Sequence, residues 1–306
     1  MDTIIQNGIT LHRWHRGDST FVVRPELGAR LMSWTLKRSK GHDRSIIYWP
    51  EDADFNEFYR VRGGNPILFP FSARSFYQGK RGYWPDADGT VRPMPMHGFA
   101  RSGTFALVET DDHSFTAELQ PTKDDHEAYP YEYRFRVRYV FEERSLQVSM
   151  TLENLDKQPI LWSAGHHFYF TLPWKANTSR EDYHFDIPGT SCYTHSSDGS
   201  LSPVKPFNSK DSFGNPENND RIFTQLSGDC ARVDLVNSDE KIRVRILQDT
   251  NTASPENAFV IWSESADSPF YCVEPWMGPP NSAEHGKGLH TVAPGEHSCF
   301  TVEVSL

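Results

Sequence analysis

The stretch YRFRVRYVF, residues 133–141, decides the fold class of this chain. Aromatic and aliphatic side chains occupy its odd positions, while arginines occupy three of its four even positions. A two-residue period is that of a β-strand with one face buried and the other in solvent. After the polar turn EERS at residues 142–145, apolar side chains move to the even positions of LQVSMTL, residues 146–152. The two stretches therefore predict an antiparallel hairpin.

The same alternation recurs toward the C-terminus, in residues 242–246 and in residues 300–306. No segment of ten or more residues shows an apolar stripe at helical spacing, and the 21 Pro and 20 Gly are spread throughout. Many strands joined by turns predict an all-β protein, a large antiparallel two-sheet β-sandwich with few short helices. Because the composition shows no break, we expect a single domain over residues 1–306.

Two stretches are rich in turn-forming residues and are predicted as long loops. They are residues 79–96, with Gly, Pro and Asp, and the polar residues 205–220. Long loops in compact domains often border binding sites, although plain surface loops are as common.

Charge and cysteine usage limit the partners that we expect. The net charge is −10, whereas nucleic acids and anionic membranes bind basic surfaces, so neither is expected as a partner. The chain has no apolar stretch of about 18 residues and no basic segment followed by an apolar run at its N-terminus. These features favour a cytoplasmic protein. The four cysteines form no C-x-x-C pair, which favours reduced thiols.

Three segments combine turn residues, aromatic residues and titratable groups. They are GGNPILFPFSAR (63–74) with MHGFAR (96–101), SAGHHFYFTLPW (163–174) and FYCVEPWMGPPN (270–281). Read alone, the histidines of these segments fit hydrogen-bonded structural residues better than catalysts. Glu274 is less ordinary, because a carboxylate is seldom found in an apolar strand without a reason. The reason is either a catalytic role or an ion pair with Arg74 or Arg101. Trp174 and Trp276 fit packing roles, with Trp276 closer to the candidate site.

Opening a cyclic hemiacetal is a reaction that suits such residues. A base removes the proton of the C1 hydroxyl while an acid protonates the ring oxygen, so one carboxylate and one protonated histidine suffice. No metal, nucleotide or redox cofactor is required. Adjacent His166 and His167 should point to opposite faces of a strand, which argues against a shared metal ion. No nucleophile elbow or phosphate-binding glycine loop occurs, and only Glu274 has the context of a glycosidase carboxylate.

Taken together, the segments resemble the aldose 1-epimerase (galactose mutarotase-like) superfamily. The resemblance rests on four motifs in order over about 220 residues, namely NPILFPFSAR (65–74), HGFAR (97–101), GHHFYF (165–170) and CVEPWMGPPN (272–281). It implies the superfamily's large β-supersandwich, with the site in an open cleft on one sheet. It further implies anomer interconversion of an aldohexose. We expect a monomer or homodimer that uses no cofactor or metal.

The resemblance also implies roles for individual residues. His167 corresponds to the family's general acid and Glu274 to its general base, with His97 assisting at the ring oxygen. Arg74 corresponds to a residue that holds sugar hydroxyls, Asp220 is a candidate for the same task, and Trp276 is a candidate for the sugar-binding surface, whereas His166 matches no functional position. Phe168 departs from the Pro or Ser of many relatives, which predicts a changed pocket wall.

Three alternatives remain open from the sequence. One is a hexose-6-phosphate 1-epimerase, in which Lys80, Arg81 and Arg92 of the first long loop would hold the phosphate, although solvated loop charges are the simpler interpretation. Another is a non-catalytic carbohydrate-binding or regulatory protein on the same scaffold. The third is a β-sandwich enzyme that cleaves polysaccharides, which is the weakest of the three because it needs a second carboxylate.

Overall fold

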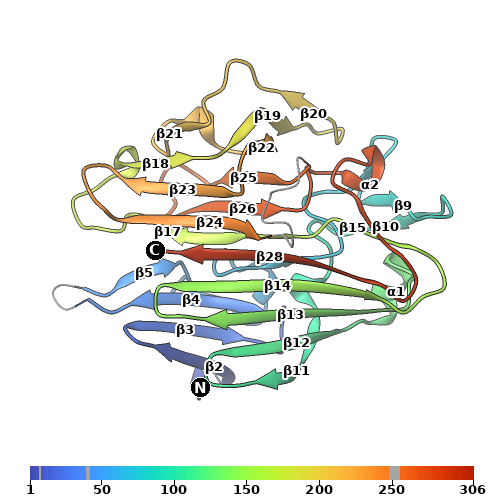
Figure 1. Cartoon of the computed structure of the whole chain (residues 1–306), viewed down its shortest axis with the longest axis horizontal. Helices are drawn as coiled ribbons and strands as arrows, with labels where there is room; N and C mark the ends of the chain where they lie inside the picture. The colour runs from blue at the N-terminus through green and yellow to red at the C-terminus, as the bar shows by residue number, and fades with distance from the viewer. Residues whose placement is uncertain (7, 39–41, 248–255) are drawn as a thin grey trace.

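Antiparallel strands make up most of the computed structural model, which describes residues 1–6, 8–38, 42–247 and 256–306. Two large sheets lie face to face, with the strands of both running roughly parallel to the long axis of the view (Figure 1). Two short α-helices, α1 (Lys123–Ala128) and α2 (Ser282–His285), and four 3-10 turns lie in the connections among the described residues. The predicted fold class, an all-β two-sheet sandwich with few short helices, is confirmed.

The larger sheet contains thirteen strands within the described residues. In spatial order its main path is β1 (Asp2–Gln6), β2 (Ile9–Arg16), β3 (Ser19–Arg24), β4 (Arg30–Leu36), β5 (Arg44–Ile47), β17 (Phe168–Thr171), β26 (Phe270–Trp276), β25 (Ala258–Trp262), β22 (Arg221–Leu226), β19 (Gly189–His195) and β20 (Leu201–Pro203). β16 (Gly165–His166) pairs with β26 and with β6 (Ile67–Leu68).

The smaller sheet contains nine described strands. Their order is β11 (Thr104–Thr110), β12 (Ser114–Gln120), β13 (Tyr133–Phe141), β14 (Ser145–Asn154), β28 (His297–Ser305), β24 (Lys241–Leu247), β23 (Cys230–Leu235), β18 (Tyr183–Asp186) and β21 (Lys210–Ser212). Three two-stranded ribbons flank the sheets: β9 (Tyr83–Pro85) with β10 (Val91–Pro93), β15 (Ile160–Trp162) with β27 (His290–Val292), and β7 (Phe76–Tyr77) with β8 (Lys80–Arg81).

The predicted hairpin is confirmed as β13 and β14, which pair in register from Tyr133 opposite Asn154 to Phe141 opposite Leu146. The arginines of β13 lie on the outer face, where Arg134 and Arg136 form ion pairs with carboxylates of neighbouring strands. The alternations in residues 242–246 and 300–306 correspond to β24 and β28, which pair with each other.

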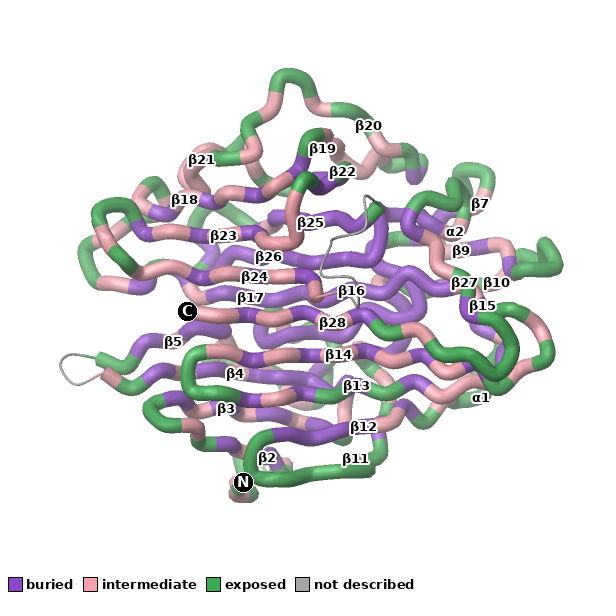
Figure 2. Tube along the Cα trace, viewed as in Figure 1, coloured by how far each residue is buried: buried purple, intermediate pink, exposed green. Residues whose placement is uncertain are grey.

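Aromatic side chains from the two inner faces fill the space between the sheets. Phe21 of β3 stacks on Phe141 of β13 with ring centroids 4.6 Å apart, and Trp14 of β2 lies 5.4 Å from Phe115 of β12. Strands β17, β25 and β26 of the larger sheet are buried over most of their length (Figure 2). Apolar burial on this scale is the main stabilising contribution to such a sandwich.

Both predicted loops contain short regular elements, so they are not wholly irregular. Residues 79–96 carry β8, β9 and β10, and residues 205–220 carry β21 and a 3-10 turn at Pro216–Asn218. Turn-rich sequence did not signal these strands because each is only two or three residues long. In the described part of the chain, no helix is long and apolar enough to cross a membrane.

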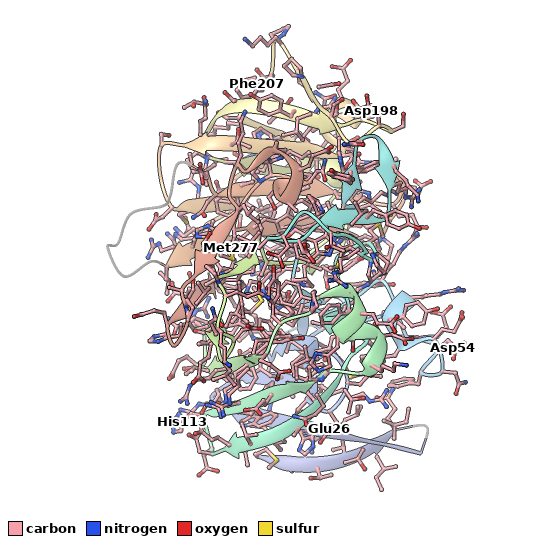
Figure 3. The ribbon with its side chains drawn as sticks, turned by 90° about the vertical axis from the view of Figure 1, so that its right-hand side faces the viewer. Glu26, Asp54, His113, Asp198, Phe207 and Met277 are labelled. Carbon is pink, nitrogen blue, oxygen red and sulfur yellow. The ribbon has the colours of Figure 1, made fainter. Side chains whose placement is uncertain are left out.

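Strand β26 lies near the centre of the larger sheet, and all seven of its residues are buried. Met277, which follows it, lies in the middle of the molecule in Figure 3, while Glu26 and His113 lie toward one end and Asp198 and Phe207 toward the other. The inner face of β26 packs on the core, whereas its outer face lines a cavity.

Candidate active site

The cavity on the outer face of the larger sheet has a volume of about 510 Å³. Its walls come from β17, β22, β25 and β26, from residues 59–62 and from the turns that carry the first two motifs. The structure brings together all six predicted site residues as lining residues of this cavity: His97, His167, Glu274, Arg74, Asp220 and Trp276.

His167 and Glu274 form the closest titratable pair in the cavity. His167 lies between β16 and β17, and the adjacent strand β26 carries Glu274. The His167 Nε2 atom lies 3.5 Å from Glu274 Oε2, and the two side chains are 11% and 2% exposed. Among the described residues, no ion pair joins Glu274 to Arg74 or Arg101. The proposed structural partners of this carboxylate are therefore replaced by a histidine.

Burial shifts the pKa values of this pair in opposite directions. It raises the pKa of Glu274 well above its usual range, and the nearby Asp220 carboxylate adds to the shift. Burial lowers the pKa of His167 to about 3, and the positive charges of Arg30 and Arg101 add to that shift. Burial therefore favours the neutral form of each group, so the proton that can move between them lies on Glu274.

His97 is held by an exchange of hydrogen bonds with Ala73. The His97 N–H donates to the Ala73 carbonyl at 2.6 Å, and the Ala73 N–H donates to His97 Nδ1 at 3.1 Å. Because Nδ1 accepts a hydrogen bond, the ring proton of neutral His97 is on Nε2. Burial and the neighbouring His167 lower the pKa of His97 well below its usual value, which keeps the ring a neutral donor.

The backbone conformation of this turn explains part of its sequence. His97 and Ala73 both have positive φ, at 66° and 60°. Gly98 follows with φ 67°, and an added Cβ there would overlap the Phe69 carbonyl. Left-handed backbone at non-glycine residues costs free energy and persists where the surroundings enforce it, as is common at functional sites.

Arg74 and Asp220 are two further polar residues that line the cavity. Asp220 has a φ of 55° and follows Asn219, whose side-chain amide exchanges two hydrogen bonds with the backbone of Ser263. Asn219 therefore fixes the turn that points Asp220 to the cavity. Desolvation raises the pKa of Asp220, while Arg74 and Arg221 oppose the shift.

Trp276 lines the cavity and is itself held in place. Its indole N–H donates to the His166 carbonyl at 3.2 Å, and its ring lies edge-on to His97 with centroids 6.2 Å apart. Gly165 allows this approach, because a Cβ at that position would overlap the indole. Trp174, by contrast, packs in the core beneath the guanidinium of Arg44.

His166 faces the opposite side of the sheet from His167, as the two-residue period predicts. Its ring stacks on Phe168 and on Phe300 of the smaller sheet, and its side chain is buried. Phe168 lies on the same inner side and packs in the core, so the predicted change in the pocket wall is wrong. Alternation along β17 places only every second residue on the cavity face.

Asn65 connects the two histidines to the core. Its Oδ1 accepts the His167 N–H at 3.1 Å, and its Nδ2 contacts Tyr139 Oη at 2.8 Å and His166 Nδ1 at 3.2 Å. The Asn65 side chain is fully buried. Asn65 thus ties the backbone at His167 to β13 of the other sheet.

Two aromatic residues of the site were missed by the sequence analysis. Tyr169 stacks on His167 with centroids 4.6 Å apart and planes 9° from parallel, and Trp262 of β25 lies edge-on at 5.8 Å. The two-residue period held a signal for Tyr169, since this residue lies two positions from His167 and therefore on the same face of the sheet. Trp262 had no such signal, because only the sheet register places it opposite Cys272.

Several cations of the cavity were also missed or assigned elsewhere. Arg60, Arg62 and Arg101 line it. Arg62 forms an ion pair with Glu264, and its guanidinium lies over the Trp262 ring. The buried Arg30 donates hydrogen bonds to carbonyls in residues 58–63 and so anchors the segment that carries two of these arginines.

The loop cations predicted to hold a phosphate do not line this cavity. Arg92 donates to Asp86 at 2.8 Å, and the Lys80 ammonium lies 3.9 Å from the centroid of the Tyr83 ring. Arg81 is exposed on the β8 ribbon.

Among the described residues, one group of three could hold a metal ion. His167, Cys272 and Glu274 each place one ligand atom within 4.8 Å of the others. All four cysteines, including Cys272, are free.

A buried histidine–carboxylate pair in a polar and aromatic cavity on a two-sheet β-sandwich defines a protein that can perform acid–base chemistry on a small polar molecule. A model of the aldose 1-epimerase family matches residues 10–305, and the chain belongs to this family. Its class is therefore that of sugar epimerases, with a small-molecule sugar as the substrate.

The chain is also similar to individual proteins. The chain is 25% identical over 265 residues to chromosomal protein LacX of Lactococcus lactis subsp. lactis, covering 83% of this chain and 85% of that protein. Among solved structures, a galactose mutarotase-like protein from Clostridium acetobutylicum has a TM-score of 0.80 at 17% identity and covers 99% and 97% of the two chains. A galactose mutarotase related enzyme from Lactobacillus acidophilus has a TM-score of 0.77 at 21% identity, covering 96% of each. These structures share the fold.

Proposed function

We propose that this protein is an aldose 1-epimerase that interconverts the α and β anomers of an aldohexose, with Glu274 as general base and His167 as general acid. The observation that carries the proposal is the 3.5 Å approach of a buried carboxylate and a buried imidazole in a cavity of sugar size. Positioned acid and base groups each contribute roughly 10²–10⁴-fold to such reactions.

The reaction conserves protons over one turnover. Glu274 takes the proton of the C1 hydroxyl, the C1–O5 bond breaks, and His167 gives its proton to O5. The aldehyde then rotates about C1–C2 and the steps reverse on the other face. In the open-chain stage Glu274 is protonated and His167 is neutral, which is the distribution that burial favours. Because burial favours the same distribution in the free protein, turnover starts from the charged form of the pair, in which the proton lies on His167.

The remaining residues have positioning roles in this proposal. The Nε2–H of His97 donates to the ring oxygen, Arg74 and Asp220 bind hydroxyls, and Trp276 lines the apolar face of the sugar. No cofactor or metal takes part in these steps.

The direct test follows the optical rotation of freshly dissolved α-D-glucose and α-D-galactose, with NMR exchange between anomers as a second readout. We expect relaxation faster than in buffer for at least one free aldohexose. No acceleration for a panel of free and 6-phosphorylated aldoses would refute the enzymatic function, and saturable binding without acceleration would support the carbohydrate-binding alternative.

A sugar phosphate is a second candidate substrate, and one observation favours it. Four arginines line the cavity, namely Arg60, Arg62, Arg74 and Arg101, and guanidinium groups bind phosphate well. Comparing kcat/KM for glucose and glucose 6-phosphate decides between the two. A preference of at least about tenfold for the phosphate, equal to about 1.4 kcal/mol, would identify the anionic sugar as the substrate.

A further inference from the structure

Cys272 has no part in the proposed reaction, yet it lies beside the catalytic pair. In β26 it is two residues before Glu274 and therefore on the same face, and across the sheet it pairs with Tyr169, two residues from His167. Its side chain is fully buried. Within the described residues, Glu274 Oε2 is buried without a hydrogen-bond partner. This oxygen lies 3.5 Å from His167 Nε2, so it is available as a ligand beside the imidazole.

The donor atoms of this cluster match the preferences of a borderline-soft divalent cation. Thiolate sulfur, imidazole nitrogen and carboxylate oxygen are the usual ligands of Zn²⁺, at about 2.0–2.3 Å from the metal, so tetrahedral ligands lie roughly 3.3–3.8 Å apart. The distance of 3.5 Å between His167 Nε2 and Glu274 Oε2 falls in this range. The three ligand atoms lie within 4.8 Å of one another, so a modest movement of the thiol completes the geometry.

We propose that His167, Cys272 and Glu274 form a binding site for Zn²⁺ or a chemically similar divalent cation, and that the bound cation inhibits the protein. The cavity supplies a water molecule as the fourth ligand. The metal occupies the lone pairs that the acid and base use, so cation and sugar exclude each other. The inhibitory half rests on the proposed function, whereas the binding half does not.

The charge balance makes the site suitable despite its burial. On binding, the S–H bond of Cys272 and the O–H bond of Glu274 break, both protons go to solvent, and an S–metal bond and an O–metal bond form. One thiolate and one carboxylate then neutralise the dication, which avoids a net charge in a desolvated site. Without a metal, Cys272 packs as a small apolar side chain against Tyr169 and Phe270.

Cobalt(II) is the suitable probe, because its thiolate complexes absorb in the near ultraviolet. We expect titration of the whole protein with CoCl₂ to give a thiolate-to-cobalt band that saturates at one equivalent and that ZnCl₂ displaces. Cys272→Ser should lose the band. Its affinity for cobalt should fall by at least about tenfold, a loss at the low end of those seen when a metal site is perturbed. Cys192→Ser is the matched control, since Cys192 is also buried and free but lies on β19 outside the cluster.

Glu274→Gln provides a second variant that leaves the thiol in place. It should retain the band at a cobalt affinity lower than that of the wild type. A wild type without the band, or a band that survives in Cys272→Ser, would overturn the proposed site. Because the titration needs no turnover, a cobalt band in a protein without epimerase activity would refute only the proposed function, and activity without a band would refute only the metal site.

Discussion

The two sheets contain similar strands but use their outer faces differently. In the smaller sheet, β13 and β14 alternate between buried inner positions and half-buried or exposed outer positions. In the larger sheet, all seven residues of β26 are buried, because segments around residues 59–62 and 96–101 rise over its outer face. The outer face of the smaller sheet meets water, whereas that of the larger sheet lines a cavity.

This difference determines what charged groups do on each face. The arginines of β13 pair with carboxylates in contact with solvent, where such pairs contribute little stability. On β26 a single carboxylate is desolvated and its pKa is strongly shifted. Burial of both faces thus converts an ordinary side chain into a chemically poised one, at a cost to stability.

Replacing Glu274 by Gln should give the largest contrast between the sheets. We expect the rate of anomer interconversion to fall by about 10²–10⁴-fold, because the amide cannot accept the C1 proton. The free energy of unfolding of Glu274→Gln should exceed that of the wild type at neutral and alkaline pH. The folded pKa of Glu274 lies above its unfolded value, so the wild type loses stability as the pH rises through the folded pKa, whereas Gln does not titrate. Polarimetry and thermal melts across pH measure both effects.

The matched change on the smaller sheet is Glu153→Gln on β14, which breaks the ion pair of this carboxylate with Arg134 of β13. It should leave activity unchanged and shift stability by less than about 1 kcal/mol. A wild-type rate in Glu274→Gln would remove this carboxylate from the mechanism.

The adjacent residues His166 and His167 allow the same comparison between the two faces of the larger sheet. His167→Asn should lose about 10²–10⁴-fold in rate through loss of the acid, while His166→Asn should retain most of the activity. Burial lowers the pKa of His166 to about 3 from 6.5, so the wild type loses stability as the pH falls from 6.5 toward 3. His166→Asn should weaken this acid dependence, as measured by denaturant titrations at several pH values. Equal rate losses in both variants would contradict the assignment to opposite faces.

The pH profile of kcat/KM tests whether the pair shares one proton. The value of kcat/KM should be maintained as the pH falls toward 3, where His167 takes up a proton and the pair then holds two protons. It should fall about tenfold per pH unit above the raised pKa of Glu274, where the pair loses its only proton. A decline with falling pH already near 6.5, the ordinary value for histidine, would show that the imidazole titrates without the burial effect.

Much of this arrangement was predictable from the sequence, and for a physical reason. Strands with one wet face carry a two-residue period, so the hairpin of residues 133–152 and strands β24 and β28 could be identified. Strand β26 carries no such period, because both of its faces are dry. There the carboxylate among apolar residues and the resemblance of the motifs to a family, and not periodicity, indicated Glu274.

The parts that escaped prediction depend on pairing between distant segments. Trp262 and Cys272 are brought together by sheet register, and Arg62 reaches the cavity only because Arg30 anchors its loop. Arg92, which the sequence left open between a phosphate contact and a plain loop charge, pairs with Asp86, six residues away. Single-sequence patterns contain no information on such contacts.

Asn65 links the two sheets, so its replacement should affect both stability and activity. Asn65→Leu removes the acceptor of the His167 N–H and the contact with Tyr139, which should cost about 1–3 kcal/mol and lower kcat. Tyr139→Phe removes only one partner and should cost about 0.5–1.5 kcal/mol with kcat preserved. Denaturant melts and polarimetry separate the effects. A loss of kcat in Tyr139→Phe equal to that in Asn65→Leu would show that the core, and not His167, transmits the change.

The smallest effect is expected for Arg134→Ala on the wet face of β13. Arg134 lies 2.6 Å from Glu153 and 3.5 Å from Glu118, with about a third of its side chain exposed (37%). Exposed pairs of this kind contribute roughly 0.2–1 kcal/mol, and salt screens them further. In denaturant melts, the free energies of unfolding of variant and wild type should therefore differ less in high salt than in low salt. The rate of anomer interconversion should not change. A loss above about 2 kcal/mol would mean that the guanidinium stem, packed on the sheet, stabilises β13 more than its charge does.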